Sequence, residues 1–223
     1  MARFARIVIP GVPHLVTQRG VQDVVTFRDD ADYAYYLALL TDFSKTANVK
    51  IWAYCLAPTQ VHLIIVPKDE DGLRRALGET HRRYARYVNA RDGRQGPVWR
   101  DRFHSSPLDK TYLLEVARYT ELGPVREGLC KKPDKWPWSS ARAHIKAKKD
   151  PMLRTKAILK RSEDWQKYLN AGVDDAMLAT IHSHEKTGRP LGSHVFIEEL
   201  EEICGRVLQL QRPGRKPRAV APD

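Results

Sequence analysis

The sequence predicts an α+β fold in which helices pack on one face of an antiparallel sheet. Two observations support this prediction. Strand-like apolar runs alternate along the chain with segments whose apolar residues recur every three or four positions, the spacing of one helix face. In addition, residues 49–66 have the pattern of one long hairpin, and a hairpin makes its two strands antiparallel neighbours.

The first half of the chain supplies most of the expected elements. Pro10, Gly11 and Pro13 interrupt an extended N-terminal segment, because proline and glycine punctuate regular structure. Besides the hairpin, the expected elements are extended residues 6–9 and 12–17, a helix over about 33–43 and a basic amphipathic helix over about 71–89.

A third helix is expected to begin next to Asp109, a residue type that caps helix N-termini, and to end at Gly123–Pro124. Residues 1–145 are therefore predicted to form the main domain. Beyond a polar linker at 146–151, we expect a small helical region over 146–210, with a helical segment at 158–169. Its last helix is capped by Ser193 and has an apolar stripe at Phe196, Ile197, Leu200, Ile203 and Val207. The basic tail, 211–223, has no apolar periodicity and is predicted to be disordered.

Composition narrows the class of protein. The formal net charge is +11 and the sequence pI is about 9.7, which predicts attraction to polyanions such as nucleic acid. No stretch reaches the roughly 18 apolar residues of a membrane-spanning helix, so no membrane association is expected. The three cysteines are scattered and lack zinc-site spacing, which favours a reducing cytoplasm over a disulfide scaffold.

Gln60 and His62 are the most informative polar pair, at the start of the second hairpin strand. Side chains two residues apart on a strand point to the same face, so these two lie side by side while Val61, Leu63 and Ile65 point to the other face. Burying polar groups in so hydrophobic a strand is costly, which indicates a function for the pair.

Several motifs in a fixed order indicate a family. They are residues 6–20, the turn and strand around Gln60 and His62, residues 96–103, residues 112–128 with Tyr119, and residues 136–140. On these motifs the chain resembles the REP-associated tyrosine transposases, which belong to the single-tyrosine HUH transposase superfamily. The resemblance implies a ferredoxin-like sheet. It also implies an endonuclease and strand transferase for single-stranded, hairpin-forming repeat DNA, with Tyr119 as the nucleophile that forms a phosphotyrosine.

The resemblance also implies a divalent cation, Mg²⁺ or Mn²⁺, bound by His62 and by Gln60, which stands where the family has its first histidine. Many members carry a third ligand, Asn or Gln, one helical turn after the tyrosine, but this chain has Gly123 there. Glu115, one turn before Tyr119, is on the same helix face and is a substitute that no family pattern supports. Two outcomes stay open: a weakened enzyme, and a DNA-hairpin-binding protein that has lost catalysis.

DNA contacts are expected from arginines. Arg19 matches a family position near bound DNA, and we expect no acidic residues to balance the charge around Arg82, Arg83 and Arg86 of the basic helix. The full set of candidate DNA-binding residues is Arg19, Arg74, Arg75, Arg82, Arg83, Arg86 and Arg215. Family members often form dimers, so the resemblance allows a homodimer, and a cytoplasmic, nucleoid-associated location is expected. RNA binding is a third alternative, which the lack of an aromatic RNA-binding strand signature disfavours.

Other conspicuous residues are expected to be structural. His14 fits a strand-end histidine that hydrogen-bonds to the backbone. Trp99, Trp136 and Trp138 fit packing positions better than base-stacking platforms.

Overall fold

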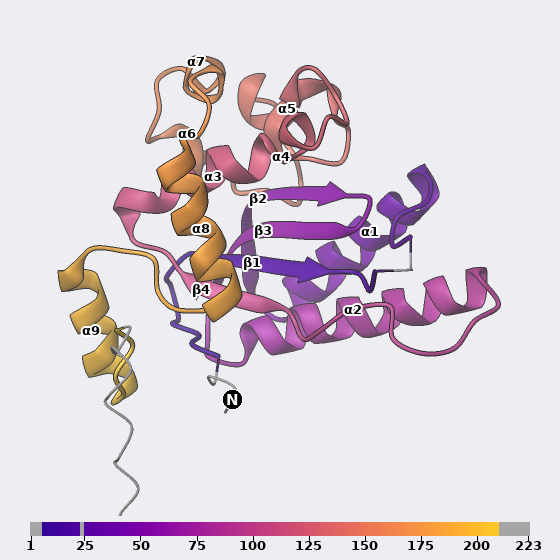
Figure 1. The fold of residues 1–223 in the computed structure, drawn as a ribbon, viewed down its shortest axis with the longest axis horizontal. Coiled ribbons are helices and arrows are strands. Elements are labelled where there is room, and N and C mark those ends of the chain that lie inside the picture. The colour runs from indigo at the N-terminus through magenta and orange to yellow at the C-terminus, as the bar shows by residue number, and fades with distance from the viewer. Residues whose placement is uncertain (1–5, 23–24, 210–223) are drawn as a thin grey trace, which may run out of the picture.

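A computed structural model of the chain describes residues 6–22 and 25–209, and its architecture is the predicted α+β arrangement (Figure 1). Within these residues four strands form one sheet of order β2-β3-β1-β4, and all neighbouring strands are antiparallel. This order, with β1 and β3 central, is that of a ferredoxin-like fold, as the sequence predicted. The strands are β1 (His14–Arg19), β2 (Val49–Ala57), β3 (Gln60–Pro67) and β4 (His104–Pro107).

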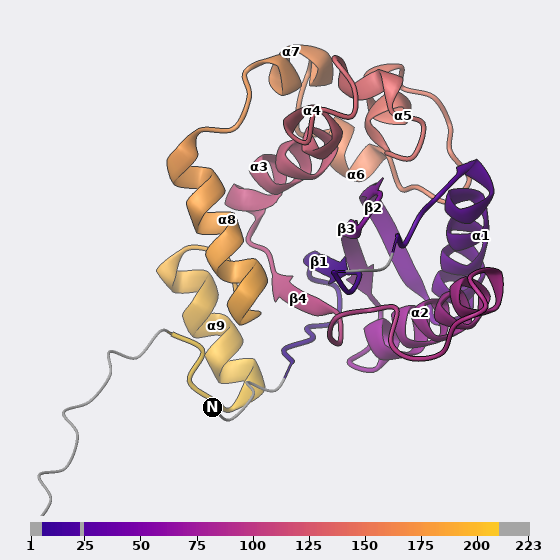
Figure 2. The ribbon, with the colours of Figure 1, turned by 45° about the vertical axis from the view of Figure 1, so that its right-hand side comes forward.

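The hairpin strands β2 and β3 turn at Pro58 and Thr59, where the sequence places the turn. Val61, Leu63 and Ile65 are buried on one face of the sheet, against α1 (Asp30–Thr46) and α2 (Gly72–Arg91). Figure 2 shows these two helices together on one side of the sheet. The predicted alternation along β3 is therefore confirmed.

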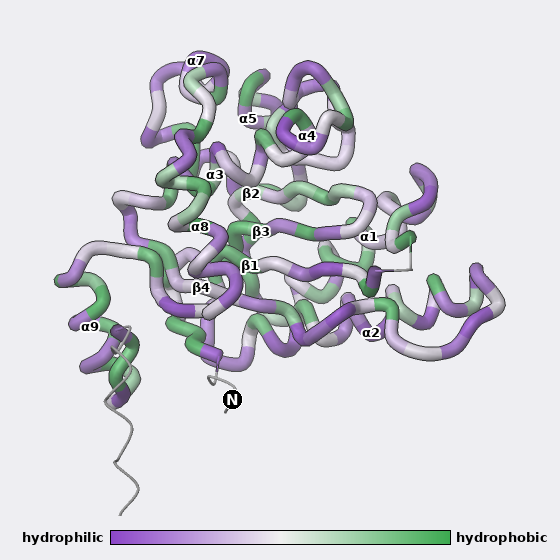
Figure 3. Tube along the Cα trace, viewed as in Figure 1, coloured by the Kyte–Doolittle hydropathy of each residue, from purple (hydrophilic) through white to green (hydrophobic). Residues whose placement is uncertain are grey.

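The helix α2 is amphipathic, with alternating apolar and polar stretches along it (Figure 3). Leu73, Leu77, Tyr84 and Val88 recur at helical spacing and are buried against the sheet and α1. All the arginines of α2 except Arg91, at its end, are left exposed on the outer side of the helix. This arrangement places the basic surface of α2 away from the sheet.

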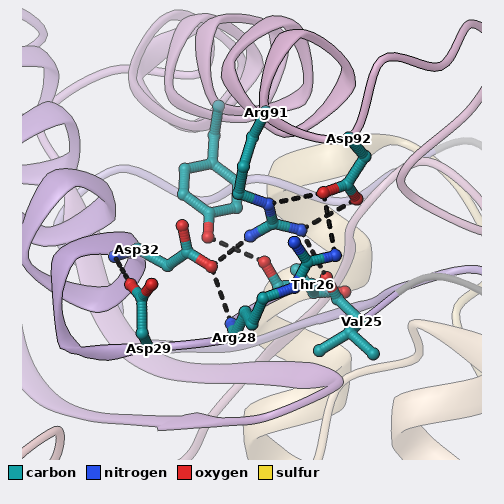
Figure 4. A network of polar contacts seen from close by, with 8 residues as sticks. Val25, Thr26, Arg28, Asp29, Asp32, Arg91 and Asp92 are labelled. Atoms are coloured by element: carbon teal, nitrogen blue, oxygen red, sulfur yellow. Dashed lines mark hydrogen bonds and ion pairs between the residues drawn. The ribbon is translucent and has the colours of Figure 1, made fainter.

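A buried ion pair fastens the loop before α1 to the end of α2 (Figure 4). The carboxylate of Asp32 accepts a 2.6 Å hydrogen bond from the backbone N–H of Arg28 and also pairs with Arg91. Arg91 further pairs with Asp92 and donates a 2.9 Å hydrogen bond to the carbonyl oxygen of Val25. Because Asp32 is fully buried, this pairing is needed to compensate for the desolvation of its charge.

The opposite face of the sheet is covered as well, so the prediction of helices on one face only was wrong (Figure 2). The helix α3 (Lys110–Glu121) packs there, followed by α4 (Gly123–Arg126). As predicted, Asp109 caps α3, accepting a hydrogen bond from the backbone N–H of Thr111. A second core joins Leu15 and Ile64 of the sheet to the apolar residues of α3 and of the helices that follow.

The C-terminal region departs from the prediction in one element and keeps close contact with the sheet. Residues 158–169 are not one helix, because the chain breaks between α6 (Lys156–Leu159) and α7 (Trp165–Asn170). Bridges join Leu153 to Ile51 of β2 and Leu191 to Leu108 beside β4. The remaining helices are α5 (Ala141–Ile145), α8 (Asp175–Thr187) and α9 (His194–Cys204), with a 3₁₀ turn at Pro133–Lys135.

Ser193 caps α9, as predicted, by accepting a 3.2 Å hydrogen bond from the backbone N–H of Phe196. The predicted apolar stripe is only partly buried. Leu200 packs against Ile7 and Ile9, whereas Ile203 is 65% exposed and Val207, which lies beyond the end of α9, is 57% exposed. The predicted disordered tail, 211–223, lies outside the described residues.

Candidate active site

His62 lies near the middle of the sheet, on β3. It stands opposite Cys55 of β2 and Thr17 of β1, and Thr17 in turn stands opposite His104 of β4. Residues directly opposite each other in a ladder point to the same face, so these four side chains form one row. The row lies on the face that α3 and α8 cover, and His62 is buried in it.

Tyr119 approaches this row from α3. Leu113 and Val116 are fully buried in the core beneath α3, and Tyr119 lies one turn further along, near the same stripe. Its ring meets the ring of His62 edge to face, with the ring centroids 5.5 Å apart. The structure therefore brings together the predicted nucleophile and one predicted metal ligand from distant parts of the sequence.

A carboxylate that the sequence did not indicate completes the site. The hydroxyl of Tyr119 donates a 3.1 Å hydrogen bond to Oε1 of Glu185, a residue of α8. Nε2 of His62 lies 3.0 Å from the same oxygen, and Nη2 of Arg19 lies 3.5 Å from Oε2. Glu185 is thus surrounded by three groups that can donate hydrogen bonds or carry positive charge. Such surroundings suit an anion.

Burial and these contacts shift the pKa values of both partners. Burial raises the pKa of the Tyr119 phenol well above its usual range, and the negative charge of Glu185 adds to this rise. Burial alone would raise the pKa of Glu185, but its contacts with His62, Arg19 and Tyr119 outweigh it and hold that pKa below its usual range. The site therefore contains a protonated phenol next to an ionised carboxylate.

The helix α8 carries Glu185 into the site on its buried stripe. Asp174 caps its N-terminus and Gly188, with φ +68°, ends it in the left-handed region that glycine favours. Ile181, four residues before Glu185, is fully buried in the same core as Tyr119. This i, i+4 spacing was the one signal in the sequence that Glu185 faces inward. It did not show what Glu185 would meet.

Arg126, from α4, covers the other side of the tyrosine. Its guanidinium carbon lies 4.2 Å from the centroid of the Tyr119 ring, a cation–π contact, and Nη1 donates a 3.1 Å hydrogen bond to the Tyr119 carbonyl oxygen. Gly123 lies next to this guanidinium: a Cβ there would be 3.8 Å from Nη2 of Arg126. The resemblance implies a third metal ligand at position 123, and the structure places the positive charge of Arg126 next to that position.

Gln60 does not share the carboxylate of Glu185. Its amide Nε2 donates a 2.6 Å hydrogen bond to Oε1 of Glu127, at the end of α4. His62 faces Glu185 and, across it, Arg19, whose charge would repel a cation. No group of three His, Cys, Asp or Glu side chains in the described parts of the chain is arranged to hold a metal ion. In this conformation the predicted ligands do not fit a metal site.

Glu115 is not the substitute ligand that the sequence left open. Its Oε1 accepts a 2.7 Å hydrogen bond from the hydroxyl of Tyr168, and its Oε2 pairs with Arg118. These contacts tie α3 to α7. The carboxylate beside Tyr119 is Glu185 instead.

Most of the predicted DNA-binding arginines lie on α2, on the opposite face of the sheet from Tyr119. The expectation that no acidic residues balance them was wrong. Glu79 pairs with both Arg82 and Arg83. Arg74 pairs with Asp71 and Arg75 with Asp69, at N–O distances of 3.0 and 2.7 Å. Their role in DNA binding, like that of Arg86, stays a prediction. Arg215 lies outside the described residues.

The residues expected to be structural are confirmed as such. His14 accepts a 3.1 Å hydrogen bond from the backbone N–H of Ile9 at Nε2, and its Nδ1 lies 2.8 Å from the carbonyl oxygen of Val12. Trp99, Trp136 and Trp138 pack against the core between the sheet and α1 and α2.

The fold resembles that of a solved transposase. A REP-associated tyrosine transposase bound to a REP hairpin superposes with a TM-score of 0.55, covering 68% of this chain and 90% of that chain at 18% sequence identity. This likeness confirms the predicted fold. A transposase candidate from Deinococcus radiodurans R1 matches at a TM-score of 0.36 and 18% identity, over 53% of this chain and 95% of that one. No protein-family model and no curated protein matches the sequence.

Proposed function

We propose that this chain is a REP-associated tyrosine transposase that cleaves and rejoins single-stranded, hairpin-forming DNA through Tyr119. The observation that carries the proposal is the convergence of Tyr119, His62 and Arg19 on one carboxylate of Glu185. A phosphodiester is also an anion whose oxygens accept hydrogen bonds from such donors. The Glu185 carboxylate therefore occupies the position that we assign to the scissile phosphate.

The chemistry follows from that position. The oxygen of Tyr119 attacks the phosphorus and forms a new oxygen–phosphorus bond, while the bond to the 3′ oxygen of the leaving strand breaks. The phenol loses its proton and the leaving oxygen gains one, which gives a phosphotyrosine and a free 3′-hydroxyl. Arg19 orients the phosphate oxygens and stabilises their charge in the transition state. Since the phosphotyrosine keeps the energy of the phosphodiester, the 3′-hydroxyl can reverse the reaction.

The described conformation is closed to substrate. Tyr119 is only 2% exposed, and its hydroxyl is already bonded to Glu185. A strand can reach the phenol only after Glu185 moves out of the site. Departure of Glu185 would also remove the charge that helps to raise the pKa of the phenol, and so favour the phenolate nucleophile.

Metal dependence, with Mg²⁺ or Mn²⁺, is the finer part of the proposal. Once Glu185 has left, Nε2 of His62 is free to bind a cation, and Gln60 could turn its carbonyl oxygen from Glu127 to the same ion. A bound divalent ion would neutralise phosphate charge during attack. Titration of Mn²⁺ into the wild type, His62→Ala and Gln60→Ala, followed by electron paramagnetic resonance, tests these two ligands directly.

The decisive experiment is a search for the covalent intermediate. The protein is incubated with labelled hairpin DNA and Mn²⁺ or Mg²⁺ and then analysed by denaturing electrophoresis. We expect a protein–DNA adduct that a chelator prevents and that Tyr119→Phe lacks. Tyr112→Phe, a change elsewhere on α3, is the matched control and should keep the adduct. An adduct that survives Tyr119→Phe would contradict the assignment of the nucleophile.

A non-catalytic DNA-hairpin-binding protein is the second candidate function. Two observations favour it: Gly123 offers no ligand side chain, and the side chain of Gln60 is engaged by Glu127. It predicts a shifted band in native electrophoresis, no adduct under any metal condition, and better competition by hairpin DNA than by RNA. RNA binding would give the reverse order of competition.

The broader setting of the protein is also proposed. No helix in the described ranges is long and apolar enough to cross a membrane. We propose a cytoplasmic, nucleoid-associated protein in which residues 146–210 add DNA contacts. A homodimer, which the resemblance allows, is tested by light scattering with and without hairpin DNA.

A further inference from the structure

Two adjoining hollows follow the β4 edge of the sheet and the C-terminal end of α8, and a third continues from them past the end of β1 to the β2–β3 turn. The middle hollow has a volume of about 230 Å³, and Glu185 lines it. It shares Arg102 and Lys186 with the hollow on one side, and Arg19 and Arg100 with the hollow on the other. Because the lining residues are shared, the hollows form one continuous trough, which we call the β4 trough.

The β4 trough is strongly basic. Five cationic side chains line it, namely Arg6, Arg19, Arg100, Arg102 and Lys186, against the two carboxylates of Asp101 and Glu185. Arg100 makes a loose 3.7 Å ion-pair contact with Asp101. Burial and the charge of Arg102 lower the pKa of Arg6 to about 10, which is a sign that positive charge is concentrated here.

The positive groups are held on a fixed scaffold. The backbone N–H of Arg100 donates a 2.9 Å hydrogen bond to the carbonyl oxygen of Arg19, and Nε2 of Gln18 donates a 3.0 Å bond to that of Asp101. Arg6 lies with its guanidinium carbon 3.6 Å from the centroid of the Phe103 ring. A binding surface whose loop is already tied to the sheet loses little entropy when it binds.

The β4 trough also leads to the candidate nucleophile. Glu185, which lines the middle hollow, accepts the hydrogen bond of the Tyr119 hydroxyl. At its far end the trough is lined by Gln60. A chain of phosphates lying in the trough would therefore pass directly beside the position that Glu185 now occupies.

We propose that the β4 trough binds the phosphate backbone of a single DNA strand and delivers it to Tyr119. This inference rests on the proposed function, because the strand that lies in the trough is the strand that Tyr119 would cut. A positively charged groove that follows the backbone is the usual means of holding a single strand. The arginines of α2 form the alternative surface, but they lie on the other face of the sheet and four of them pair with acids.

Salt-dependent binding distinguishes the two surfaces. The affinity for a labelled single strand that flanks a hairpin is measured by fluorescence anisotropy between 50 and 200 mM salt, for Arg100→Gln/Arg102→Gln and for the matched Arg74→Gln/Arg75→Gln. Each phosphate contact contributes about 0.7 to the slope of log affinity against log salt for single strands. Loss of two contacts should therefore shrink the affinity ratio between the two salt concentrations by about sevenfold in the trough variant. The α2 variant should match the wild type.

Equal slopes in the trough variant and the wild type would overturn the inference, as would a larger change in the α2 variant. Both arginines of the trough variant are exposed, so unchanged thermal unfolding is the check that it folds. The outcome is separable from that of the proposed function. An adduct that forms normally in the trough variant refutes the trough alone, whereas trough-dependent binding without any adduct refutes catalysis alone.

Discussion

Two buried carboxylates, Glu121 at the end of α3 and Glu185 of α8, lie on the same side of the sheet, and their partners differ in kind. Glu121 accepts hydrogen bonds from Ser140, His144 and Trp165, at 2.5, 2.5 and 2.7 Å. These partners belong to or adjoin α5 and α7 and hold those helices to α3. Glu185 instead meets Tyr119, His62 and Arg19, which come from three elements of the main domain.

The difference separates a structural carboxylate from one that occupies a reactive site. Every partner of Glu121 is a donor that serves to connect elements. Each partner of Glu185 could equally bind a phosphate, and Glu185 lines the β4 trough. We infer that Glu121 must stay in place for the protein to fold, whereas Glu185 must leave for it to act.

The largest expected effect is on folding, in Glu121→Ala. The change leaves the buried donors of His144 and Trp165 without an acceptor, while the Ser140 hydroxyl keeps only its 3.2 Å contact with the Tyr54 carbonyl oxygen. Breaking such a network costs about 3–5 kcal/mol of unfolding free energy. Urea unfolding followed by circular dichroism measures the loss. Glu115→Ala, which removes a carboxylate that is 25% exposed and also contacts α7 through Tyr168, is the control and should cost about 1–2 kcal/mol. Equal losses in the two variants would contradict the structural role of Glu121.

A second large effect concerns acid, and it arises at a buried histidine that has no carboxylate beside it. Burial lowers the pKa of His14 to about 4, below its ordinary value of 6.5. The folded state thus favours neutral His14, which stabilises the protein above pH 6.5. That stabilisation is lost as the pH falls from 6.5 towards 4, by about 3 kcal/mol in total.

His14→Gln should flatten this part of the curve of stability against pH, because glutamine does not titrate. The stabilisation from Glu185 has a different range. Since its pKa is lowered, its contribution is complete above about pH 4.5 and disappears only as the pH falls through its lower, folded value. A curve that is unchanged by His14→Gln between pH 6.5 and 4 would show that His14 is not a source of acid lability.

Glu185→Gln is expected to lower the unfolding free energy less than the two preceding changes, but to raise the rate of adduct formation strongly. The neutral amide has the same size but loses its charge interaction with Arg19 and His62. If the closed state is weakened by about 1.4 kcal/mol, the open fraction rises about tenfold. The rate of adduct formation should rise by the same factor. Glu198→Gln, an exposed change on α9, is the control and should leave the rate unchanged.

This variant also tests the opposite role for Glu185. A residue that takes part in catalysis, for example as a metal ligand, would lose rate rather than gain it when its charge is removed. A slower reaction in Glu185→Gln, with normal unfolding and normal hairpin affinity, would therefore replace the closed-state interpretation by a catalytic one.

The sequence predicted those parts of the site that depend on local pattern. Strand alternation placed His62 on the face of the sheet opposite to Val61. The Asp109 cap and the Gly123–Pro124 stop placed Tyr119 on a helix. Their meeting followed from the fold that the motifs indicated. The expectation that no acidic residues balance the arginines of α2 could have been corrected from the sequence. Glu79 stands three and four residues before Arg82 and Arg83, which is the spacing of helical ion pairs.

Glu185 could not be predicted, because its contacts depend on how α8 docks. It lies 66 residues from Tyr119, in a region that the sequence described only as helical. Periodicity can indicate which side of a helix is apolar, but it carries no information on which element that side meets. The same limit applies to the β4 trough, whose cations come from the segment before β1, from β1, from the loop before β4 and from the end of α8.

The smallest expected change in unfolding free energy is that of Gly123→Ala. It tests whether lack of space explains why position 123 carries no metal-ligand side chain. A Cβ there would lie 3.6 Å from Sγ of Cys55 and 3.8 Å from Nη2 of Arg126, which are ordinary van der Waals distances. Gly123 opens α4 and its backbone is not in the left-handed region, so nothing in its conformation requires glycine. Gly123→Ala should change the unfolding free energy by no more than about 0.5 kcal/mol. A loss of several kcal/mol would mean that the space is needed. If Gly123→Ala is tolerated, Gly123→Asn tests the metal site directly. A gain in Mn²⁺ affinity in this variant would show that the third ligand is all that the metal site lacks.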